Sequence, residues 1–171
     1  MKYLIGDIGN TSTKLCILNE KFKIFRSYEF QTDKIYKGSF LKKFLSNKLT
    51  KDLNKVFLFS SVVPKAFKEI KKKFKNSQYK FLEIKDFDLK KIIRINIKNK
   101  HRLGSDRIAN AIGVQKYKNC LVLDFGTATT FDVIKDGKYE GGVIAPGIKL
   151  SMKNLIKSTA LLSKINLISH Q

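Results

Sequence analysis

Residues 4–13 read Leu4-Ile5-Gly6-Asp7-Ile8-Gly9-Asn10-Thr11-Ser12-Thr13, an apolar run that ends in an aspartate and turns at a glycine. Such a run predicts a buried strand, and residues 14–18 predict the strand that returns beside it. A second copy of the pattern reads Val122-Leu123-Asp124-Phe125-Gly126-Thr127-Ala128-Thr129-Thr130, and it lies 117 residues further along the chain. A strand, turn and strand repeated in this way predict two homologous lobes.

Short strands and helices alternate along the rest of the chain. Apolar runs and period-two alternation predict strands over 2–6, 14–18, 22–30, 56–63, 81–84, 92–97, 121–124, 131–134 and 138–144. Apolar spacings of three and four residues, with Pro64 and Ser105 at helix starts, predict helices over 34–48, 64–75, 105–117 and 147–160. This order predicts an α/β fold with mixed sheets, with a first lobe over 1–117 and a second over 118–171.

The two copies differ in length. The first has about 116 residues, whereas the second has only about 54 before Gln171. We therefore expect that the second lobe is incomplete and that the chain is a fragment or a naturally truncated product. An incomplete lobe should have an open sheet edge or an exposed apolar face, which a partner could cover.

The composition excludes several classes of protein. With 43% hydrophobic residues the chain can form a core, and it has no apolar run long enough for a membrane span. Its two cysteines lack metal-site spacing, which together with the absence of a signal peptide favours the cytoplasm. The net charge of +21 could serve a polyanion, but 31 of the 35 basic residues are lysine and are dispersed, which favours a solvated surface.

The two hairpin turns carry the first candidate site. In residues 7–14 the turn glycine can direct backbone N–H groups at a phosphate, while hydroxyls and Lys14 add donors and positive charge. Asp7 at the strand end can hold a phosphate-bound Mg²⁺ through water. Asp124 emerges in the same way from the second strand, so that two facing turns would grip a nucleotide's phosphates. The alternative for either turn alone is an ordinary β-hairpin.

Two further segments are candidates. In Gly104-Ser105-Asp106-Arg107, Asp106 lies in the first turn of a predicted helix, and Arg107 could bind a substrate carboxylate. Without chemistry, Asp106 would be an ordinary acidic residue at a helix start. In Gly141-Gly142-Val143-Ile144-Ala145-Pro146-Gly147, small residues would let a ligand or a second backbone approach closely.

These motifs together resemble the type III pantothenate kinases, a family of the actin-like/hexokinase-like ATPase superfamily. The resemblance rests on Asp7-x-Gly-Asn-Thr, Ser60-Ser-Val-Val-Pro, Gly104-x-Asp-Arg, Asp124-x-Gly-Thr-Ala-Thr-Thr and Gly141-Gly-x-Ile-x-Pro-Gly, in that order. It covers residues 1–162 and implies two actin-like (ribonuclease H-like) lobes. It also implies phosphorylation of pantothenate by ATP, the first step of coenzyme A synthesis.

The resemblance implies a role for each motif residue. ATP with Mg²⁺ would lie at Asp7, Ile8, Gly9, Asn10, Thr11, Ser12, Thr13 and Lys14, and would also touch Thr127. Pantothenate would lie at Gly104, Ser105, Asp106 and Arg107, with Asp106 as the catalytic base. Asp124 would hold a monovalent cation, K⁺ or NH₄⁺. The family implies a cytoplasmic homodimer. We expect no membrane binding, and nucleic-acid binding is not favoured but is not excluded by the net charge of +21.

Two features depart from the family pattern. Residues 95–101 lack the tyrosine and proline that often precede Gly-x-Asp-Arg, and the family's downstream Asn-Thr segment is absent. Two alternatives remain open at this point. One is a non-catalytic nucleotide- or nucleic-acid-binding regulator of the Bvg accessory factor type, with which the net charge is compatible. The other is a kinase of the same fold for another small molecule.

Overall fold

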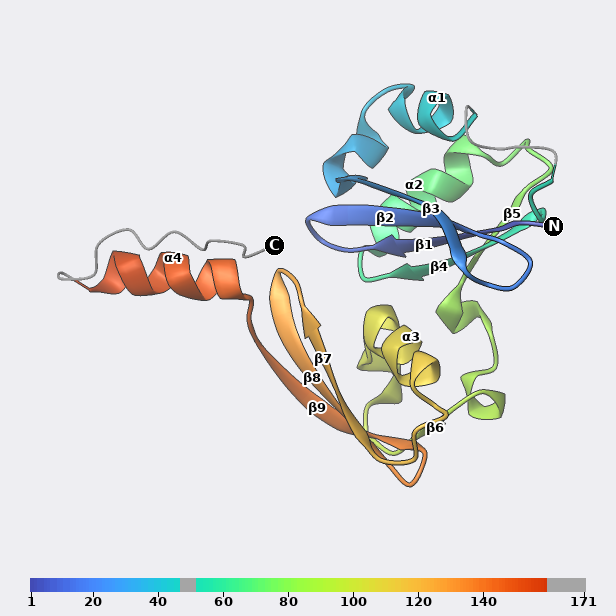
Figure 1. Cartoon of the computed structure of the whole chain (residues 1–171). Coiled ribbons are helices and arrows are strands. Elements are labelled where there is room, and N and C mark those ends of the chain that lie inside the picture. Colours follow the sequence, from blue (N-terminus) through green and yellow to red (C-terminus); the bar gives the residue numbers. More distant parts are fainter. Residues whose placement is uncertain (47–51, 160–171) are drawn as a thin grey trace.

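The computed structural model describes residues 1–46 and 52–159 of the chain (Figure 1). Its first sheet has the strand order β3-β2-β1-β4-β5. These strands are β1 (Tyr3–Ile8), β2 (Ser12–Leu18), β3 (Ile24–Gln31), β4 (Val56–Ser61) and β5 (Lys80–Glu83). The first three form an antiparallel meander, while β4 and β5 run parallel to β1. The sheet is therefore mixed, as the alternation of elements predicts.

Helices cover one face of the first sheet. They are the 3-10 helix η1 (Thr32–Tyr36) and the helices α1 (Phe40–Ser46) and α2 (Pro64–Lys73). A core cluster, which includes Phe57 and Phe59 at 0% and 1% exposure, fills the space beneath them. The single helix predicted over 34–48 is wrong, because Gly38 lies between η1 and α1 with φ +38, outside the helical region. Residues 47 and 48 of that prediction lie outside the described residues.

The second sheet has the order β6-β9-β8-β7. Its strands are β6 (Arg94–Ile95), β7 (Cys120–Phe125), β8 (Ala128–Lys135) and β9 (Lys138–Pro146). The last three form an antiparallel meander like that of the first sheet, and β6 joins β9 in parallel. Asp136 and Gly137 both have positive φ, 50° and 69°, as a two-residue hairpin turn between β8 and β9 requires.

A connecting segment joins the two sheets. It consists of η2 (Ile84–Asp86), η3 (Leu89–Lys91), β6, η4 (Lys100–Arg102) and α3 (Ser105–Gly113). In Figure 1, α3 lies between the two sheets. Ile84, Ile93 and Ile108 belong to a second core cluster with Ile134 and Tyr139. The lobe boundary after residue 117 stays a prediction, whereas core packing favours a division near residue 83.

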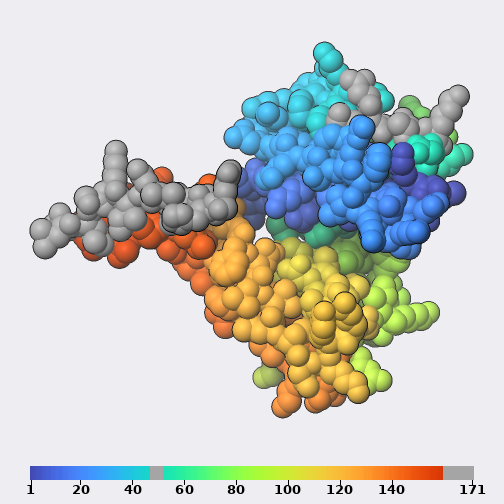
Figure 2. Space-filling view, viewed as in Figure 1, coloured from blue at the N-terminus to red at the C-terminus, as the bar shows by residue number. Residues whose placement is uncertain are grey.

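The second sheet has an exposed apolar edge. Among the described residues β7 has a neighbour on one side only, and its Leu121, Leu123 and Phe125 are 55%, 45% and 61% exposed. Helix α4 (Ile148–Ser158) buries none of its residues and projects from the end of β9, away from both sheets (Figures 1 and 2). The expected open edge and exposed apolar face are thus confirmed. Within residues 1–46 and 52–159, no helix is both long and apolar enough to cross a bilayer.

Candidate functional site

Two hairpin turns face each other across the boundary between the sheets. In the turn between β1 and β2, the Gly9 amide donates to the Ser12 carbonyl at 3.0 Å. In the turn between β7 and β8, the Gly126 amide donates to the Ala128 carbonyl at 2.9 Å. Short backbone loops of this kind leave other amides free to face a ligand. The structure therefore brings the two predicted loops together, as the repeat suggested.

The two hairpins are not identical. Asp7 is paired across the strands with Lys14, whereas Asp124 is paired with Thr130. The second turn is thus one residue shorter, so the repeat distance of 117 residues holds up to the turn and becomes 116 after it. The first hairpin consequently carries an ammonium group opposite its aspartate, and the second carries a hydroxyl group there.

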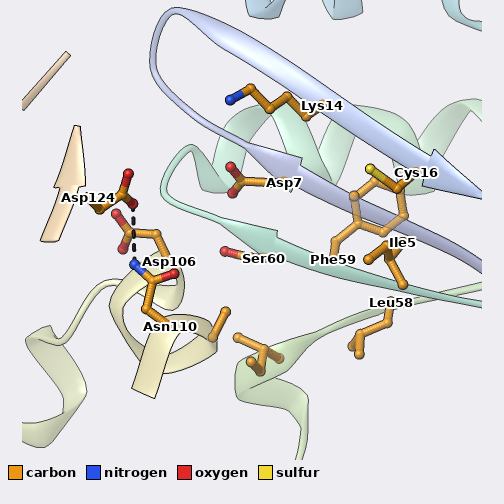
Figure 3. A pocket seen from close by; sticks show the side chains of 13 residues that line it. Ile5, Asp7, Lys14, Cys16, Leu58, Phe59, Ser60, Asp106, Asn110 and Asp124 are labelled. Carbon is orange, nitrogen blue, oxygen red and sulfur yellow. Dashed lines mark hydrogen bonds between the residues drawn. The ribbon is translucent and has the colours of Figure 1, made fainter. Parts of the chain in front are cut away.

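Two adjoining cavities lie beside the two hairpins. The smaller, of about 180 Å³, is polar and lies between the two turns. The larger, of about 350 Å³, is mainly apolar and lies beside α3. Both are lined by Asp7, Lys14, Asp106 and Asp124, which makes them two parts of one cleft. Figure 3 shows the three carboxylates pointing toward this common space from β1, α3 and β7.

Two of the carboxylates are held by hydrogen bonds. The Arg107 amide donates to Asp106 Oδ1 at 2.8 Å, which directs this side chain over the first turn of α3. Asn110 Nδ2 donates to Asp124 Oδ2 at 3.2 Å, as the dashed line in Figure 3 shows. Asn110 stands one helical turn after Asp106 and therefore lies on the same face of α3. Asn110 is not among the site residues predicted from the sequence, although its spacing of four from Asp106 is a usable signal.

The pKa of Asp7 is raised above its ordinary value of 3.8. Burial is the main cause, and the negative charges of Asp106 and Asp124 raise the pKa further. The neighbouring Ser60 and Lys14 lower it and offset part of this effect. The cleft is thus short of positive charge, so a cation bound there would relieve the repulsion among its carboxylates.

The donors in the cleft suit a cation that is bound together with a phosphate. Among residues 1–46 and 52–159, no three His, Cys, Asp or Glu side chains form a group that could hold a metal ion by themselves. However, Thr130 Oγ1 is buried beside Asp124 and has no hydrogen-bond partner within the described part of the chain. A carboxylate and a free hydroxyl are oxygen ligands that Mg²⁺ or K⁺ accepts, and phosphate or water would supply the others.

Most residues predicted to bind ATP border the smaller cavity. They are Asp7, Gly9, Asn10, Thr11, Ser12, Lys14 and Thr127. Ile8 and Thr13 are fully buried instead and support the turn from within the core. Thr32, which is not among the predicted site residues, anchors that turn: its hydroxyl donates to the Gly9 carbonyl at 2.7 Å and lies 3.0 Å from Thr13 Oγ1.

The segment 104–107 divides between two surroundings. Asp106 lies in the cleft, while Ser105 is buried beside a different cavity, near Pro64 and Glu83. Gly104 precedes α3 in an extended conformation, with φ −63° and ψ 146°. Arg107 is only 9% exposed and borders neither part of the cleft. This placement differs from the expectation that Arg107 forms part of the substrate site.

Arg107 makes a buried ion pair. Its Nε donates to Asp132 Oδ1 at 2.6 Å, and the same oxygen accepts a hydrogen bond of 2.7 Å from Tyr139 Oη. Burial and the Asp132 carboxylate raise the pKa of Tyr139 above its usual range, so that its hydroxyl stays protonated and donates. A Cβ atom at Gly142 would collide with Arg107 Nη2 and with the Phe131 carbonyl. The group that approaches the Gly141-Gly142 segment is therefore this guanidinium.

Comparisons with known proteins agree with the motifs. The chain is 47% identical over 167 residues to a type III pantothenate kinase of Pelagibacter ubique, and 35% identical over 174 residues to one of Thermosipho melanesiensis. Each comparison covers 96% of this chain and 66% of the relative, so the chain spans about two thirds of the length of these curated relatives.

A similar fold occurs in a crystal structure described as a Baf family transcriptional activator from Campylobacter jejuni. The TM-score is 0.56 and the identity 21%, over 98% of this chain and 67% of that one. This likeness supports the α/β fold with two mixed sheets. The family model of type III pantothenate kinase matches residues 3–171. From this match and the two relatives, we conclude that the chain belongs to the type III pantothenate kinase family.

Proposed function

We propose that this chain contributes the nucleotide- and substrate-binding cleft of an enzyme that phosphorylates pantothenate to 4′-phosphopantothenate with ATP, the first step of coenzyme A synthesis. One observation carries the proposal: carboxylates from β1, α3 and β7 meet in one cleft, between two glycine- and hydroxyl-containing turns. Phosphoryl transfer depends mainly on positioning and on charge stabilisation, and this arrangement offers both.

The two hairpins would divide the charges of ATP between them. On the first, turn amides, the hydroxyls of Thr11 and Ser12, and Lys14 would bind phosphate oxygens. On the second, Asp124 and Thr130 offer oxygen atoms to a monovalent cation, K⁺ or NH₄⁺, and Thr127 would touch ATP. Asp7 would hold Mg²⁺ through phosphate or water. These cations, when bound, would neutralise charge that develops on the transferred phosphoryl group.

Asp106 would act as the catalytic base. In this step the pantothenate hydroxyl oxygen bonds to the γ-phosphorus, and the bond between that phosphorus and the β,γ-bridging oxygen breaks to release ADP. The hydroxyl proton passes to the Asp106 carboxylate. Because the Arg107 amide already binds Oδ1 at 2.8 Å, Oδ2 is the oxygen we expect to accept the proton.

The larger cavity would receive pantothenate. Pantothenate carries two methyl groups on the carbon next to its reactive hydroxymethyl group, and that cavity offers apolar contacts from Ile5, Leu58 and Ala109 beside Asp106. The segment 104–107 would border the substrate, with Asp106 facing it and Arg107 behind. Apolar contacts next to a polar reacting centre are typical of small-molecule sites.

We further propose a cytoplasmic homodimer, as the family resemblance implies. The exposed Leu121, Leu123 and Phe125 on β7 give such an assembly an apolar surface to bury. Sedimentation of the chain at several concentrations tests this, since a monomer at all of them would contradict it. The names of the two curated relatives favour the kinase over the regulatory alternative, because both are type III pantothenate kinases.

A coupled ADP-release assay with pantothenate, ATP, Mg²⁺ and K⁺ tests the function. We expect pantothenate-dependent turnover that Asp106→Asn lowers by about 10²-fold or more, since a positioned base contributes about 10²–10⁴. Asp88→Asn is the matched control, because Asp88 is exposed and caps η3, a role that asparagine can also fill. No turnover by the unsubstituted chain, or equal loss in both variants, would overturn the proposal.

A further inference from the structure

Arg107, Asp132 and Tyr139 form a buried cluster, and none of the three borders either cavity of the cleft. We propose that Asp132 and Tyr139 are positioning residues, which hold the base Asp106 in the cleft by fixing Arg107. This inference rests on the proposed function, in which Asp106 accepts the proton of the substrate hydroxyl. Asp132 and Tyr139 lie outside the cleft, so their role would be to position the base and not to contact the substrate.

The cluster joins three elements through one oxygen atom. Arg107 comes from α3, Asp132 from β8 and Tyr139 from β9. Arg107 Nε and Tyr139 Oη both donate to Asp132 Oδ1, at 2.6 and 2.7 Å. The side chains of Asp132 and Tyr139 are 0% and 1% exposed, so that water does not compete for these bonds. The first turn of α3 is thus tied to the middle of the β8-β9 hairpin.

The tie sets the direction of the neighbouring side chain. Successive residues of an α-helix point about 100° apart around its axis, because there are 3.6 residues per turn. When the Arg107 side chain is fixed in the second core, Asp106 is therefore directed toward the cleft. The Arg107 amide donates to Asp106 Oδ1 at 2.8 Å, and the Ile108 amide donates to the Gly104 carbonyl at 3.1 Å. Rotation of this turn would disturb both bonds and move the carboxylate.

The cluster is poorly arranged for a purely stabilising role. Arg107 Nη2 and Asp132 Oδ2 are buried and have no hydrogen-bond partner within residues 1–46 and 52–159. A buried pair stabilises a fold only when its remaining donors and acceptors are also satisfied, and otherwise apolar residues of similar size serve as well or better. Gly142 on β9, which leaves room for the guanidinium, shows that the surrounding backbone also accommodates Arg107.

Two single variants test the proposal in the full chain. Tyr139→Phe keeps the ring and removes one hydrogen bond to Asp132, whereas Asp132→Asn removes the charge. We expect kcat to fall by about tenfold in the first and by up to about 10²-fold in the second, because small misplacements of a reacting group have effects of this size. The KM for ATP should change by less than about twofold, since Asp106 does not hold the nucleotide. Unchanged kcat in both variants would overturn the proposal.

Hydrogen exchange provides a measurement that does not depend on activity. If the cluster fixes the first turn of α3, the amides of Arg107 and Ile108 exchange faster in Asp132→Asn, while those of β1 and β4 keep their protection. A purely structural role would instead raise exchange throughout the second core, and that result would contradict the proposal. If the unsubstituted chain has no kinase activity, the proposed function fails, but this measurement still decides whether the turn is held.

A double variant separates positioning from stability. Arg107→Met with Asp132→Leu replaces the buried pair with apolar side chains, which should give a melting temperature at least equal to that of Asp132→Asn. We expect kcat to remain low in the refolded double variant. Recovery of kcat together with stability would show that the pair is only structural. Asp33→Asn is the control, because it removes an exposed ion pair with Lys37 and should leave kcat unchanged.

Discussion

Thr11 and Thr127 meet at the tips of the two hairpin turns, with their hydroxyl oxygens 2.9 Å apart although 116 residues separate them in the sequence. The bond is exposed, and both residues border the smaller cavity. Both residues are predicted to bind ATP. The two hydroxyls therefore satisfy each other in the structure, and each would exchange this partner for a phosphate oxygen when a nucleotide binds.

Thr127→Val should weaken ATP binding with little effect on folding. The loss of one hydrogen bond corresponds to about 0.5–1.5 kcal/mol, or an increase in Kd of about 2- to 12-fold. The melting temperature should stay within about 1 °C, because the bond is exposed and competes with water. Calorimetric titration with ATP and Mg²⁺ measures the Kd. Ser77→Ala, which removes an exposed hydroxyl remote from the cleft, should leave it unchanged.

Asp7→Asn should stabilise the chain at neutral pH while it weakens Mg²⁺-dependent ATP binding. The pKa of Asp7 is raised in the folded state, mainly by burial and then by Asp106 and Asp124. The folded state therefore binds a proton more tightly than the unfolded state, and stability is lost as the pH rises through the folded pKa. Asparagine does not ionise, so the Asp7→Asn variant keeps the stability that the parent chain loses, and its melting temperature should exceed that of the parent at pH 7. The difference should vanish near pH 3.8 and below.

Asp33→Asn is the matched control with the opposite sign. Hydrogen bonding to Lys37 lowers the pKa of Asp33, so its carboxylate contributes stability above its unfolded pKa and none well below it. Asp33→Asn should therefore leave the melting temperature at pH 7 equal or lower, never higher. Thermal unfolding at pH 7 and pH 3.5 compares the two variants. If Asp7→Asn lowers the melting temperature at pH 7, the account of the cleft's electrostatics is wrong.

The sequence predicts the hairpins well because their information is local. Alternating apolar residues and turn glycines define β1, β2, β7 and β8, and the repeat of Asp7 at Asp124 indicates that the turns belong together. The one-residue difference between the turns is not visible in the sequence, because Thr13 aligns with a threonine in either register, with Thr130 at a distance of 117 residues and with Thr129 at a distance of 116. Cross-strand pairing alone decides that Thr130, and not Phe131, stands opposite Asp124.

The buried Arg107 shows where sequence reasoning fails. A solvated or ligand-bound arginine is expected beside Asp106, since arginine is rarely buried unless it is paired. Its partner Asp132 is 25 residues away on β8, and the strand pattern gives no sign that α3 packs against that strand. Similarly, Thr32 supports the Gly9 turn from the start of η1, directly after β3, and only the three-dimensional fold brings it there. Long-range polar contacts of this kind depend on tertiary packing.

Thr130→Val should alter the response to K⁺ without destabilising the chain. Thr130 is only 7% exposed, and its hydroxyl has no hydrogen-bond partner within the described residues. Replacing a buried, unpaired hydroxyl by a methyl group of the same shape is nearly neutral or stabilising. If the hydroxyl is a cation ligand, the K⁺ concentration for half-maximal turnover should rise by about 5- to 10-fold, roughly the effect of one lost ligand contact. A K⁺ titration of ADP release measures this, and an unchanged midpoint would exclude Thr130 from the cation site.

Gly104→Ala should impair turnover far more than stability. The backbone at residue 104 has φ −63° and ψ 146°, a conformation that alanine adopts without strain. A Cβ atom there would, however, collide with Asp106 Oδ1, which can move only by swinging the carboxylate out of its present position. We expect kcat to fall by about 10- to 100-fold, as for a misplaced reacting group, and the melting temperature to change little.

Gly113→Ala at the other end of α3 is the control, since a Cβ atom at that position meets no other atom within 4 Å. That substitution should stabilise the helix by about 0.5–1 kcal/mol and leave kcat unchanged. A Gly104→Ala chain with full kcat would show that the observed direction of Asp106 is not required for turnover.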